Sequence, residues 1–493
     1  MPGKTGQQSG GEHRNGEQAK EKAAAAAKPG MSSRGGNARA NRSAVSGGKA
    51  RSAREAALET LTRIETGQAY SNLLLNRVLQ SADLDRKESA LATELVYGTV
   101  QRKNTIDYFL NRFLPKGVEK LEPWVRNLLR LSFYQLYYLD RIPEHAAVSE
   151  AVNIAKRKGH AGISGLVNGV LRNVIRRKDE LTVPAGLEAA ARMALEHSHP
   201  EWLAAAWIRR FGEETAERIC RANNEPPRTA IRVNRRKLSR GELLEQLRAE
   251  GIEAYPSKLS DAGLIVESGG NMAFLPAYRN GLFSIQDESS MLVAELLDVR
   301  PGMRVLDCCA APGGKTAHIA ELMDDAGQII ACDIHEHKRK LVAEQAERLG
   351  LRSIETVTAD ALELPEMFAG QTFDRILLDA PCSGLGVIRR KPDIKWTKKP
   401  EEIESIAKLQ YKLLERVSKL LAPGGLLVYS TCTVTEEENE LVIGKFLRNF
   451  SGFAPADPPE RLRGPDAMAG TVTILPHQFG SDGFFIARLT RTT

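Results

Sequence analysis

The chain has 493 residues, of which 42% are hydrophobic and 27% charged, a composition typical of ordinary globular domains. Six cysteines are too few for a disulfide framework and no apolar run is long enough to span a bilayer, so we expect a cytoplasmic protein with reduced thiols. The formal net charge is +7, but residues 1–50 contain nine Lys or Arg and three Glu, which leaves the rest of the chain close to neutral.

Residues 1–50 contain ten Gly and no Phe, Trp, Tyr, Leu or Ile. Such a segment cannot bury enough apolar surface to offset the entropy that is lost on ordering, so we predict a disordered basic tail. Its basic excess can help to hold RNA by displacing counterions, but a solubilising extension explains the same composition equally well.

Apolar residues recur at helical spacing throughout residues 52–180, and this pattern predicts an all-α domain. The repeats include Ala57, Leu61, Ile64, Leu74, Leu75, Val78, Leu91, Leu95, Val96, Leu128, Leu131 and Leu136. Pro123 suits the first turn of a helix, whereas Pro143 and Gly159 indicate breaks between helices.

Residues 181–282 combine shorter elements and predict a helical linker followed by a small α+β module. Helical patterns cover 200–223 and 243–251, and strand patterns cover 230–233 and 264–266. The module carries a basic cluster of Arg228, Arg232, Arg235, Arg236 and Lys237. A strand edge rich in Arg can track phosphates, and a solvated charged face is an equally strong alternative.

Strand-like runs alternate with helical stretches over residues 283–493, which predicts an α/β domain with a Rossmann-like parallel sheet. The expected strands are 304–307, 329–333, 355–360, 375–379 and 426–431. Two more, at 471–475 and 484–489, are joined by a short connection and can form a hairpin at one edge of the sheet.

The first of these strands leads into a helix through a turn of small residues. The turn consists of Cys309, Ala310, Ala311, Pro312, Gly313, Gly314 and Lys315. Small residues let the backbone approach a ligand, and a helix N-terminus favours anionic or polar groups. The turn lacks the earlier Gly of a P-loop and the spaced glycines of a dinucleotide fingerprint, so it does not define the ligand by itself.

Four aspartates end four successive predicted strands, namely Asp307, Asp333, Asp360 and Asp379. Asp333 stands where a carboxylate can accept hydrogen bonds from ribose hydroxyls, and Asp360 can face an adenine. A single Asp at a strand end commonly forms a turn, but four at the edge that faces a ligand crevice favour a site for a nucleotide-like cofactor.

Metal binding is an alternative use of the cysteines near these strand ends. Cys332 is close to two histidines in sequence, but the spacing fits no common zinc pattern. Adjacent strand residues point to opposite faces of a sheet, so Cys308 and Cys309 cannot readily bind one ion. We therefore expect no metal, interpret Cys332 as a core residue, and assign Cys308 no chemistry.

Two other cysteines follow strand-like runs, Cys382 after 375–379 and Cys432 after 426–431. Carboxyl ends of neighbouring strands line one crevice, so both thiols are expected beside the cofactor turn. A thiolate that adds to C6 of cytosine makes C5 able to attack an electrophilic methyl group, for which the sulfonium of S-adenosylmethionine is the natural donor. The C5 proton must then leave, and a second thiol or Asp379 can assist. The residues alone leave open which cysteine attacks.

Six segments of the C-terminal half, at 283–290, 309–316, 379–384, 390–396, 430–433 and 482–485, together resemble the RNA cytosine-5 methyltransferases of the Nol/Nop/Sun group. Residues 94–99 and 167–172 resemble the antitermination-factor NusB fold. The resemblance spans 52–493 and implies a multidomain chain. Its parts are an all-α NusB-like RNA-binding domain, the small α+β module, and an α/β Rossmann-like class I methyltransferase domain that uses S-adenosylmethionine.

The resemblance also implies roles for the site residues. Cys432 would be the nucleophile and Cys382 the thiol that assists product release. The 309–315 turn, Asp333, Asp360 and Asp379 would contact the cofactor, with Lys315 near loop carbonyls or the cofactor carboxylate. The implied substrate is a cytidine of 16S ribosomal RNA, and a monomer that binds neither membrane nor metal is the default expectation.

Basic residues surround Trp396 just beyond Cys382: Arg389, Arg390, Lys391, Lys395, Lys398 and Lys399. This set can hold phosphates and stack an extruded base on the indole, although Trp396 can also pack against the sheet. Two other protein classes stay open. A non-catalytic RNA-binding or antitermination protein has no need of both thiols and an intact turn, and a DNA cytosine methyltransferase fits poorly with the second thiol and the helical domain.

Overall fold

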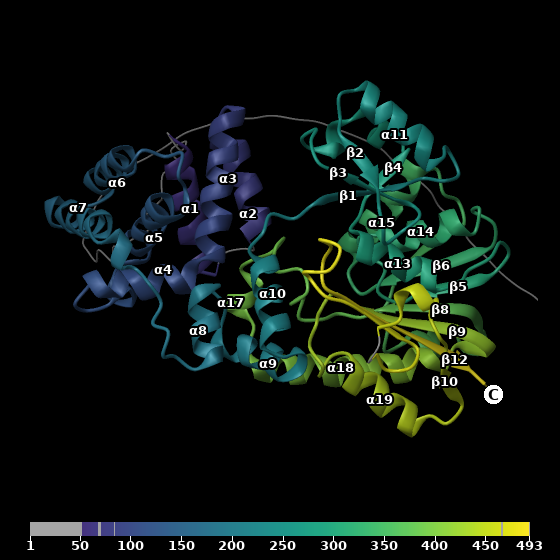
Figure 1. Cartoon of the computed structure of the whole chain (residues 1–493). Coiled ribbons are helices and arrows are strands. Elements are labelled where there is room, and N and C mark those ends of the chain that lie inside the picture. Colours follow the sequence, from purple (N-terminus) through teal and green to yellow (C-terminus); the bar gives the residue numbers. More distant parts are fainter. Residues whose placement is uncertain (1–51, 68–70, 83, 465–466, 493) are drawn as a thin grey trace, which may run out of the picture. The chain divides into compact units, whose positions relative to one another are not determined.

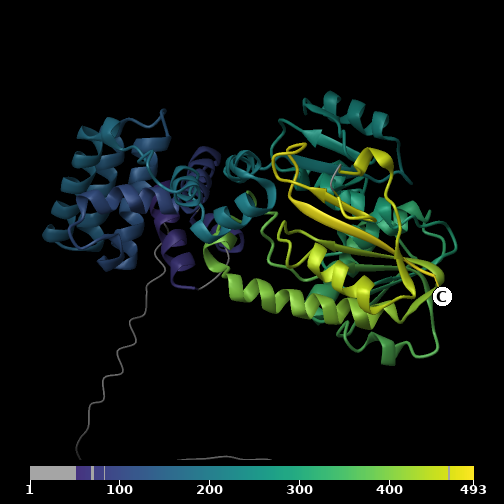
Figure 2. The ribbon, with the colours of Figure 1, turned by 60° about the horizontal axis from the view of Figure 1, so that its bottom comes forward.

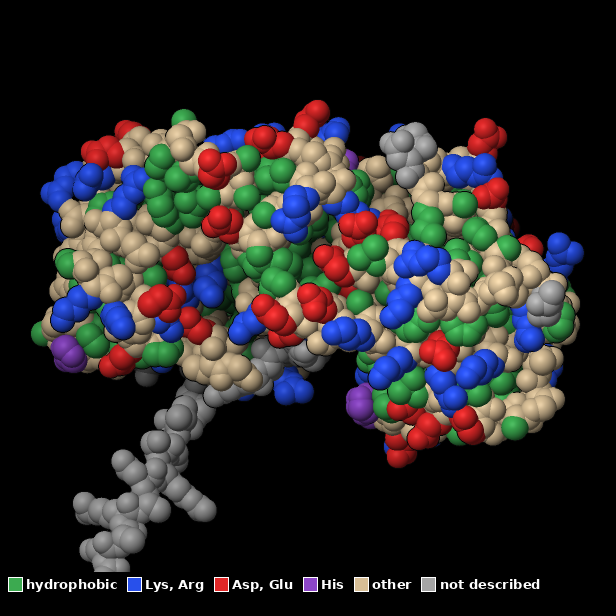
Figure 3. Space-filling model, turned by 90° about the horizontal axis from the view of Figure 1, so that it is seen from below, with side chains coloured by type: hydrophobic (Ala, Val, Ile, Leu, Met, Phe, Trp, Pro, Cys, Tyr) green, Lys and Arg blue, Asp and Glu red, His purple; other side chains and the backbone are tan. Residues whose placement is uncertain are grey.

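The computed structural model describes residues 52–67, 71–82, 84–464 and 467–492. The predicted disordered tail, residues 1–50, lies outside these ranges. Within them, no helix is long and apolar enough to cross a membrane. On the face drawn in Figure 3, Lys and Arg side chains are interspersed with Asp and Glu, in agreement with the small net charge of the chain beyond the tail.

The first described helices form the predicted helical domain (Figure 1). They are α1 (Ala53–Glu65), α2 (Ser71–Ala82), α3 (Arg86–Gln101), α4 (Lys103–Leu110), α5 (Pro123–Tyr138), α6 (Glu144–Lys158) and α7 (Ala161–Arg176), with short 3-10 turns η1 (Asn111–Phe113), η2 (Val118–Lys120) and η3 (Lys178–Glu180). Pro123 opens α5, and Pro143 and Gly159 flank α6, as predicted. Residues 127–136 of α5 are buried without a break, so this helix is surrounded by its neighbours and lies inside the shared core.

Three helices lead into a small antiparallel sheet. The helices are α8 (Ala189–Glu196), α9 (Glu201–Phe211) and α10 (Glu213–Asn223). The helix predicted over 200–223 is thus two helices, because Gly212 has a φ of +78° that ends the first one. The sheet has the order β2-β3-β1-β4, from β1 (Thr229–Val233), β2 (Ala254–Pro256), β3 (Gly263–Val266) and β4 (Phe283–Ile285), and is covered by α11 (Arg240–Ala249) with η4 (Met272–Phe274) and α12 (Pro276–Arg279) nearby. β4 belongs to this sheet although it follows the predicted domain boundary at 282.

The C-terminal part contains an eight-stranded sheet of order β10-β12-β9-β8-β5-β6-β7, with β11 paired to β12. Its strands are β5 (Arg304–Asp307), β6 (Gln328–Asp333), β7 (Ile354–Thr358), β8 (Phe373–Asp379), β9 (Leu421–Thr431), β10 (Phe453–Pro455), β11 (Thr471–Ile474) and β12 (Phe484–Arg491). β7, β6, β5, β8 and β9 are parallel, as predicted. β11 and β12 form the expected hairpin, but β12 is an inner strand because it also pairs with β9 and β10.

Helices cover both faces of this sheet (Figure 1). One face carries α13 (Glu288–Leu296), α14 (Gly314–Leu322) and α15 (Glu336–Leu349). The other carries α16 (Leu364–Met367), α18 (Pro400–Ser418) and α19 (Glu440–Asn449), and Figure 2 shows α18 as one long helix along that side. The short helix α17 (Ile394–Thr397) precedes α18, and η5 (Glu460–Leu462) precedes β11. This two-layer cover leaves the carboxyl ends of the parallel strands free to form a crevice.

Candidate active site

A cavity of 470 Å³ lies at the carboxyl ends of β5, β8 and β9. Most of the predicted site residues line it, namely Cys309, Ala310, Ala311, Pro312, Gly314, Lys315, Asp379 and Cys432. Thr229 and Ala230 of the small sheet also line it, so the α+β module contributes to the wall. The cavity therefore joins the cofactor-type turn and one of the two thiols in a single space.

The two thiols lie beside each other, with the sulfurs of Cys382 and Cys432 3.3 Å apart. The strand register explains this placement, because Asp379 of β8 pairs with Ser430 of β9 and both chains continue past the sheet edge. Cys432 lines the cavity, whereas Cys382 contacts Cys432 but is not among the residues that line it, and both side chains are half-buried. The pair is thus asymmetric, with one sulfur open to a ligand and the other in contact with the first.

The surroundings of the sulfurs give the two thiols opposite acidities. The hydrogen bond from the Cys382 thiol lowers the pKa of Cys432, and the ammonium groups of Lys315 and Lys391 add to this effect against burial. The same hydrogen bond raises the pKa of Cys382, and burial and the carboxylates of Glu438 and Asp379 act in the same direction. The pair is therefore arranged to hold a thiolate on Cys432 and a proton on Cys382.

Lys315 of the turn forms an ion pair with Asp379, with 2.7 Å between Nζ and Oδ2. Ser430 Oγ donates to the other carboxylate oxygen of Asp379 at 2.7 Å. Although burial opposes the charge on Lys315, the carboxylate of Asp379 raises the pKa of the ammonium group. The positive charge of Lys315 is thus held at the end of β8, and its contacts with loop carbonyls or with the cofactor carboxylate stay predictions.

Asp307, at the end of β5, is the most perturbed carboxyl group of the cavity. It is fully buried, and burial raises its pKa to about 7 despite a hydrogen bond from Thr316 Oγ1 to Oδ2 at 2.7 Å. Its Oδ1 atom has no hydrogen-bond partner among the described residues, and the residue lines the cavity. Buried polar atoms are rarely left unpaired, so this one fits a polar ligand in the cavity.

Asp333, Asp360 and Gly313 do not line the cavity. Asp333 Oδ1 accepts from the backbone N–H of His335 at 3.1 Å, and Asp360 Oδ1 accepts from that of Leu362 at 2.9 Å. Both carboxylates therefore form local turns after their strands. Contacts between these two residues and a cofactor stay predictions.

Several side chains that were expected to meet RNA have internal partners instead. Arg389 donates to the carbonyls of Gly480 and Pro476, and Lys395 is fully buried. Arg390 forms ion pairs with Asp287 and Asp482. Trp396 Nε1 donates to the Val100 carbonyl of α3 at 2.7 Å, so the indole packs on the helical domain, and the expectation that it packs against the sheet was wrong. Local sequence did not reveal these partners because they come from distant segments.

Arg232, which the sequence places in a basic cluster expected to track phosphates or to form a solvated face, fits neither expectation because it has no exposed surface. It is fully buried on β1, forms an ion pair with Glu321 of α14, and donates to the Gly314 carbonyl at 2.7 Å. Its partner could not be inferred from the sequence, because Glu321 lies 89 residues away. The residue ties the small sheet to the start of the helix that follows the turn.

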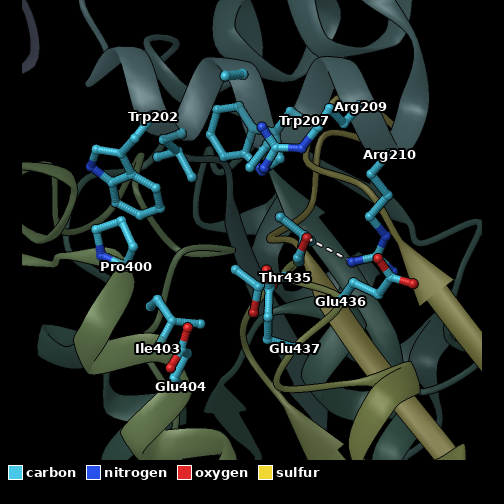
Figure 4. Close-up of a pocket in the computed structure, with 14 residues that line it drawn as sticks. Trp202, Trp207, Arg209, Arg210, Pro400, Ile403, Glu404, Thr435, Glu436 and Glu437 are labelled. Atoms are coloured by element: carbon cyan, nitrogen blue, oxygen red, sulfur yellow. Dashed lines mark hydrogen bonds between the residues drawn. The ribbon is translucent and has the colours of Figure 1, made fainter.

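A second cavity, of 320 Å³, lies beside the loop that follows Cys432 (Figure 4). Trp202 and Trp207 of α9 line one side of it, and the segment 434–437 lines another. Arg210 donates to the Val434 carbonyl at 2.9 Å, the dashed line in Figure 4, and pairs with Glu440. None of the predicted site residues lines this cavity, so we place the chemistry in the larger one. No cluster of three or more metal-ligating side chains is found among the described residues.

Three family models match the chain: the NusB family over residues 51–176, the RsmF/B-like methyltransferase ferredoxin-like domain over 199–273, and 16S rRNA methyltransferase RsmB/F over 294–490. A probable ribosomal RNA small subunit methyltransferase B from Bacillus subtilis is 48% identical over 448 residues, which cover 90% of this chain and 99% of that protein. The chain belongs to the ribosomal RNA small subunit methyltransferase B family. A member of that family from Pseudomonas syringae is 37% identical over 89% of this chain and 96% of its own length.

Solved structures agree with this assignment. The crystal structure of PH0851 has a TM-score of 0.76 and 27% identity, and covers 89% of this chain and 98% of that one. The structure of NSun6 from Pyrococcus horikoshii with SFG has a TM-score of 0.55 and 27% identity, and covers 60% and 98%. Membership of the ribosomal RNA small subunit methyltransferase B family confirms the predicted enzyme class, a methyltransferase, and the predicted NusB-like, small α+β and methyltransferase domains.

Proposed function

We propose that this enzyme transfers a methyl group from S-adenosylmethionine to C5 of a cytidine in 16S ribosomal RNA, through a covalent bond between Cys432 and C6. The observation that carries the proposal is the asymmetric pair of thiols, with Cys432 on the wall of the cavity and the Cys382 sulfur 3.3 Å from the Cys432 sulfur. The names of the family and of its members, which refer to 16S and small subunit ribosomal RNA, support the substrate.

The residues present fit the proposed methyl donor. Asp307 Oδ1 lacks a partner, and Gly314 of the turn lines the same cavity without a side chain to fill it. When bound, the donor supplies an electrophilic methyl group. Lys315 is engaged by Asp379 and so is placed to stabilise charge near the thiols. The fit is with a polar, nucleoside-like ligand, and the NSun6 structure with SFG supports ligand binding in this fold.

The acidities of the thiols support the ranking of the two cysteines. Cys432 attacks C6 as a thiolate, C5 gains the electron pair and becomes methylated, and the base then carries both the new methyl group and its original C5 proton. The main cause of the raised pKa of Cys382 is its hydrogen bond to Cys432. Once the Cys432 sulfur is bonded to C6 it no longer accepts that proton strongly, so the half-buried Cys382 loses it to water, the one proton that the reaction releases overall, and then takes the C5 proton as a thiolate. The C5–C6 double bond reforms and Cys432 leaves as a thiolate.

The proposal is tested by incubating the protein with labelled S-adenosylmethionine and unmodified 16S RNA and mapping the labelled base. Cys432→Ala should abolish transfer while retaining cofactor binding. Cys382→Ala should accumulate a protein–RNA adduct, seen as a slow band on a denaturing gel. Cys220→Ala, a buried cysteine of α10 outside the cavity, is the matched control and should transfer label normally.

Two results would contradict the proposal in different ways. Label on adenine, or on DNA with none on cytosine, refutes the substrate and the reaction. An adduct from Cys432→Ala and none from Cys382→Ala reverses the roles of the cysteines but leaves the reaction in place. A cytoplasmic location and a monomeric state complete the proposal, and light scattering of the purified protein tests the second.

A further inference from the structure

A buried polar cluster adjoins the two thiols. Glu438 and Asn439 follow Cys432 in the loop between β9 and α19, and neither has any exposed surface. Buried polar side chains of this kind are costly unless every group finds a partner. The partners of these two residues are the immediate neighbours of the two cysteines.

Glu438 holds the chain on both sides of Cys382. Its Oε2 atom accepts from the backbone N–H of Ser383 at 2.8 Å and from Gln410 Nε2 at 3.1 Å. Its Oε1 atom accepts from Ser383 Oγ and from Thr435 Oγ1. Gln410 Nε2 also donates to the Pro381 carbonyl at 2.9 Å, so the residues before and after Cys382 are connected to one carboxylate.

Asn439 holds the chain on both sides of Cys432. Thr431 Oγ1 donates to Asn439 Oδ1 at 2.6 Å, and Asn439 Nδ2 donates to the Thr433 carbonyl at 3.1 Å. Thr431 and Thr433 have no exposed surface, so water does not compete for these bonds. The backbone that carries the Cys432 sulfur is therefore fixed from both directions.

The two halves of the cluster are joined through Ser383 and Thr433, whose hydroxyl oxygens are 2.9 Å apart. Ser383 uses its only hydroxyl proton toward Glu438, so Thr433 must donate in this contact. A second link runs from the backbone N–H of Gly386 to the Cys432 carbonyl at 2.9 Å. The loop after β8 and the loop after β9 are thus bonded to each other next to the two cysteines.

We propose that Glu438 is a positioning residue that, together with Asn439, sets the separation of the Cys382 and Cys432 sulfurs. This inference rests on the proposed roles of the two cysteines. A carboxylate suits the task because it accepts all four hydrogen bonds and donates none. An amide at this position can keep its oxygen toward the Ser383 N–H and Gln410, but its NH2 group then faces the hydroxyls of Ser383 and Thr435, which can no longer donate to it. The contact between Ser383 and Thr433 that joins the two loops would then have to reorganise.

The charged groups around the thiols come from several elements, and Glu438 acts among them. Lys315 from α14 and Lys391 from the loop after β8 favour the Cys432 thiolate, while Asp379 at the end of β8 disfavours it. Glu438 and Asp379 disfavour a thiolate on Cys382. Tyr429 of β9 donates its hydroxyl to the Glu438 carbonyl and stays neutral, because burial raises its pKa. Loss of Glu438 should therefore weaken the hydrogen bond between Cys382 and Cys432. It should also remove one of the negative charges that disfavour a thiolate on Cys382.

The test compares Glu438→Gln with Glu437→Gln, which removes the charge of the exposed neighbouring residue. Alkylation of Cys432 by iodoacetamide is followed from pH 6 to 10 by mass spectrometry of its peptide, in the full chain without RNA. Glu438→Gln should move the alkylation profile to higher pH, and each unit of upward shift lowers the rate at neutral pH by about tenfold. In the methylation assay it should lower kcat and leave KM for the cofactor unchanged, and Glu437→Gln should match the wild type in both.

Coincident alkylation profiles for Glu438→Gln and the wild type would overturn the inference, as would an equal shift in Glu437→Gln. Where Glu438→Gln fails to fold, as judged by its thermal melt, Ser383→Ala decides. That variant removes the link to Thr433 but keeps the carboxylate, and it should shift the profile in the same direction by about threefold in rate; an unshifted profile overturns the inference. Because alkylation needs no RNA, its outcome is separate from the success or failure of the proposed methylation of cytosine.

Discussion

Replacement of Arg232 by Met is expected to destabilise the folded chain by about 3–5 kcal/mol. The guanidinium group has no exposed surface and makes a two-point ion pair with Glu321, at 3.0 Å from Nε and 2.9 Å from Nη2. The Glu321 side chain is only 4% exposed, so the substitution leaves a buried carboxylate without its counter-charge. That uncompensated charge dominates the effect, because Met retains most of the apolar volume of Arg.

The double variant Arg232→Met with Glu321→Leu separates this mechanism from a loss of packing. Removal of both charges together should be close to neutral, because no buried ion is then left unpaired. Urea unfolding followed by far-UV circular dichroism, with thermal melts in parallel, measures the difference. The single variant should lower the melting temperature by roughly 5–10 °C, while the double variant should lie near the wild type.

A single variant that loses less than about 1 kcal/mol, or a double variant as unstable as the single one, would refute this reasoning. The ion pair between Lys340 and Glu336 on α15 provides the control. Its atoms are 3.2 Å apart but both side chains are largely exposed, so Lys340→Ala should leave the unfolding curve unchanged.

Three further predictions concern the site and its connections. Burial raises the pKa of Asp307 to about 7 from a usual 3.8. The protonated carboxyl group therefore stabilises the fold below pH 3.8, and this stabilisation is lost as the pH rises through 7. In urea unfolding between pH 4 and 7, the free energy of unfolding of the wild type, relative to Asp307→Asn, should fall by at most about 1.4 kcal/mol per pH unit. Trp396→Phe removes the hydrogen bond to the Val100 carbonyl and should cost about 1 kcal/mol in urea unfolding, with a loss of kcat. Gly386→Ala places a methyl group 2.0 Å from the Gly483 carbonyl oxygen, so the loops must move, and methyl transfer should be lost in the labelling assay.

Each of these has a control and a contrary result. Asp261→Asn changes an exposed carboxylate and should keep the pH dependence of the wild type, and a flat difference between Asp307→Asn and the wild type would contradict the raised pKa. A Trp396→Phe variant with the wild-type melt and kcat would show that the indole contact carries no function. Gly165→Ala, on an open helix surface, should be neutral or stabilising by about 0.5–1 kcal/mol, and equal loss in both Gly variants would point to a general intolerance.

Most strands of the parallel sheet could be located from the sequence, because each is an apolar run that ends at or near an Asp. The predicted start of one strand at 426 was late, since β9 begins at Leu421 and pairs with β8 through an irregular register. β10 was not predicted because three residues, Phe453–Pro455, carry no alternation. The break at Gly212 was missed because a helical apolar pattern continues across it.

The site was partly predictable for a similar reason. The 309–315 turn and Cys432 could be predicted as site residues because each comes just after the end of a predicted strand, where the cavity lies. The pattern of four Asp did not separate Asp307 and Asp379, which line the cavity, from Asp333 and Asp360, which form local turns. Nothing in the local sequence indicated that Arg389 and Arg210 turn inward, because the carbonyls that accept from them lie 91 and 224 residues away.

The contact between Trp396 and Val100 limits which fragments and which chimeras of this enzyme should be active. The segment 382–397 begins at a thiol and ends on α3, so a fragment that lacks the helical domain would expose the indole and free one end of that segment. A chimera that joins the helical domain of one relative to the catalytic domain of another must preserve the α3 surface and α17 together. Exchange of whole domains at linker boundaries should therefore yield folded but weakly active hybrids unless both surfaces come from the same parent.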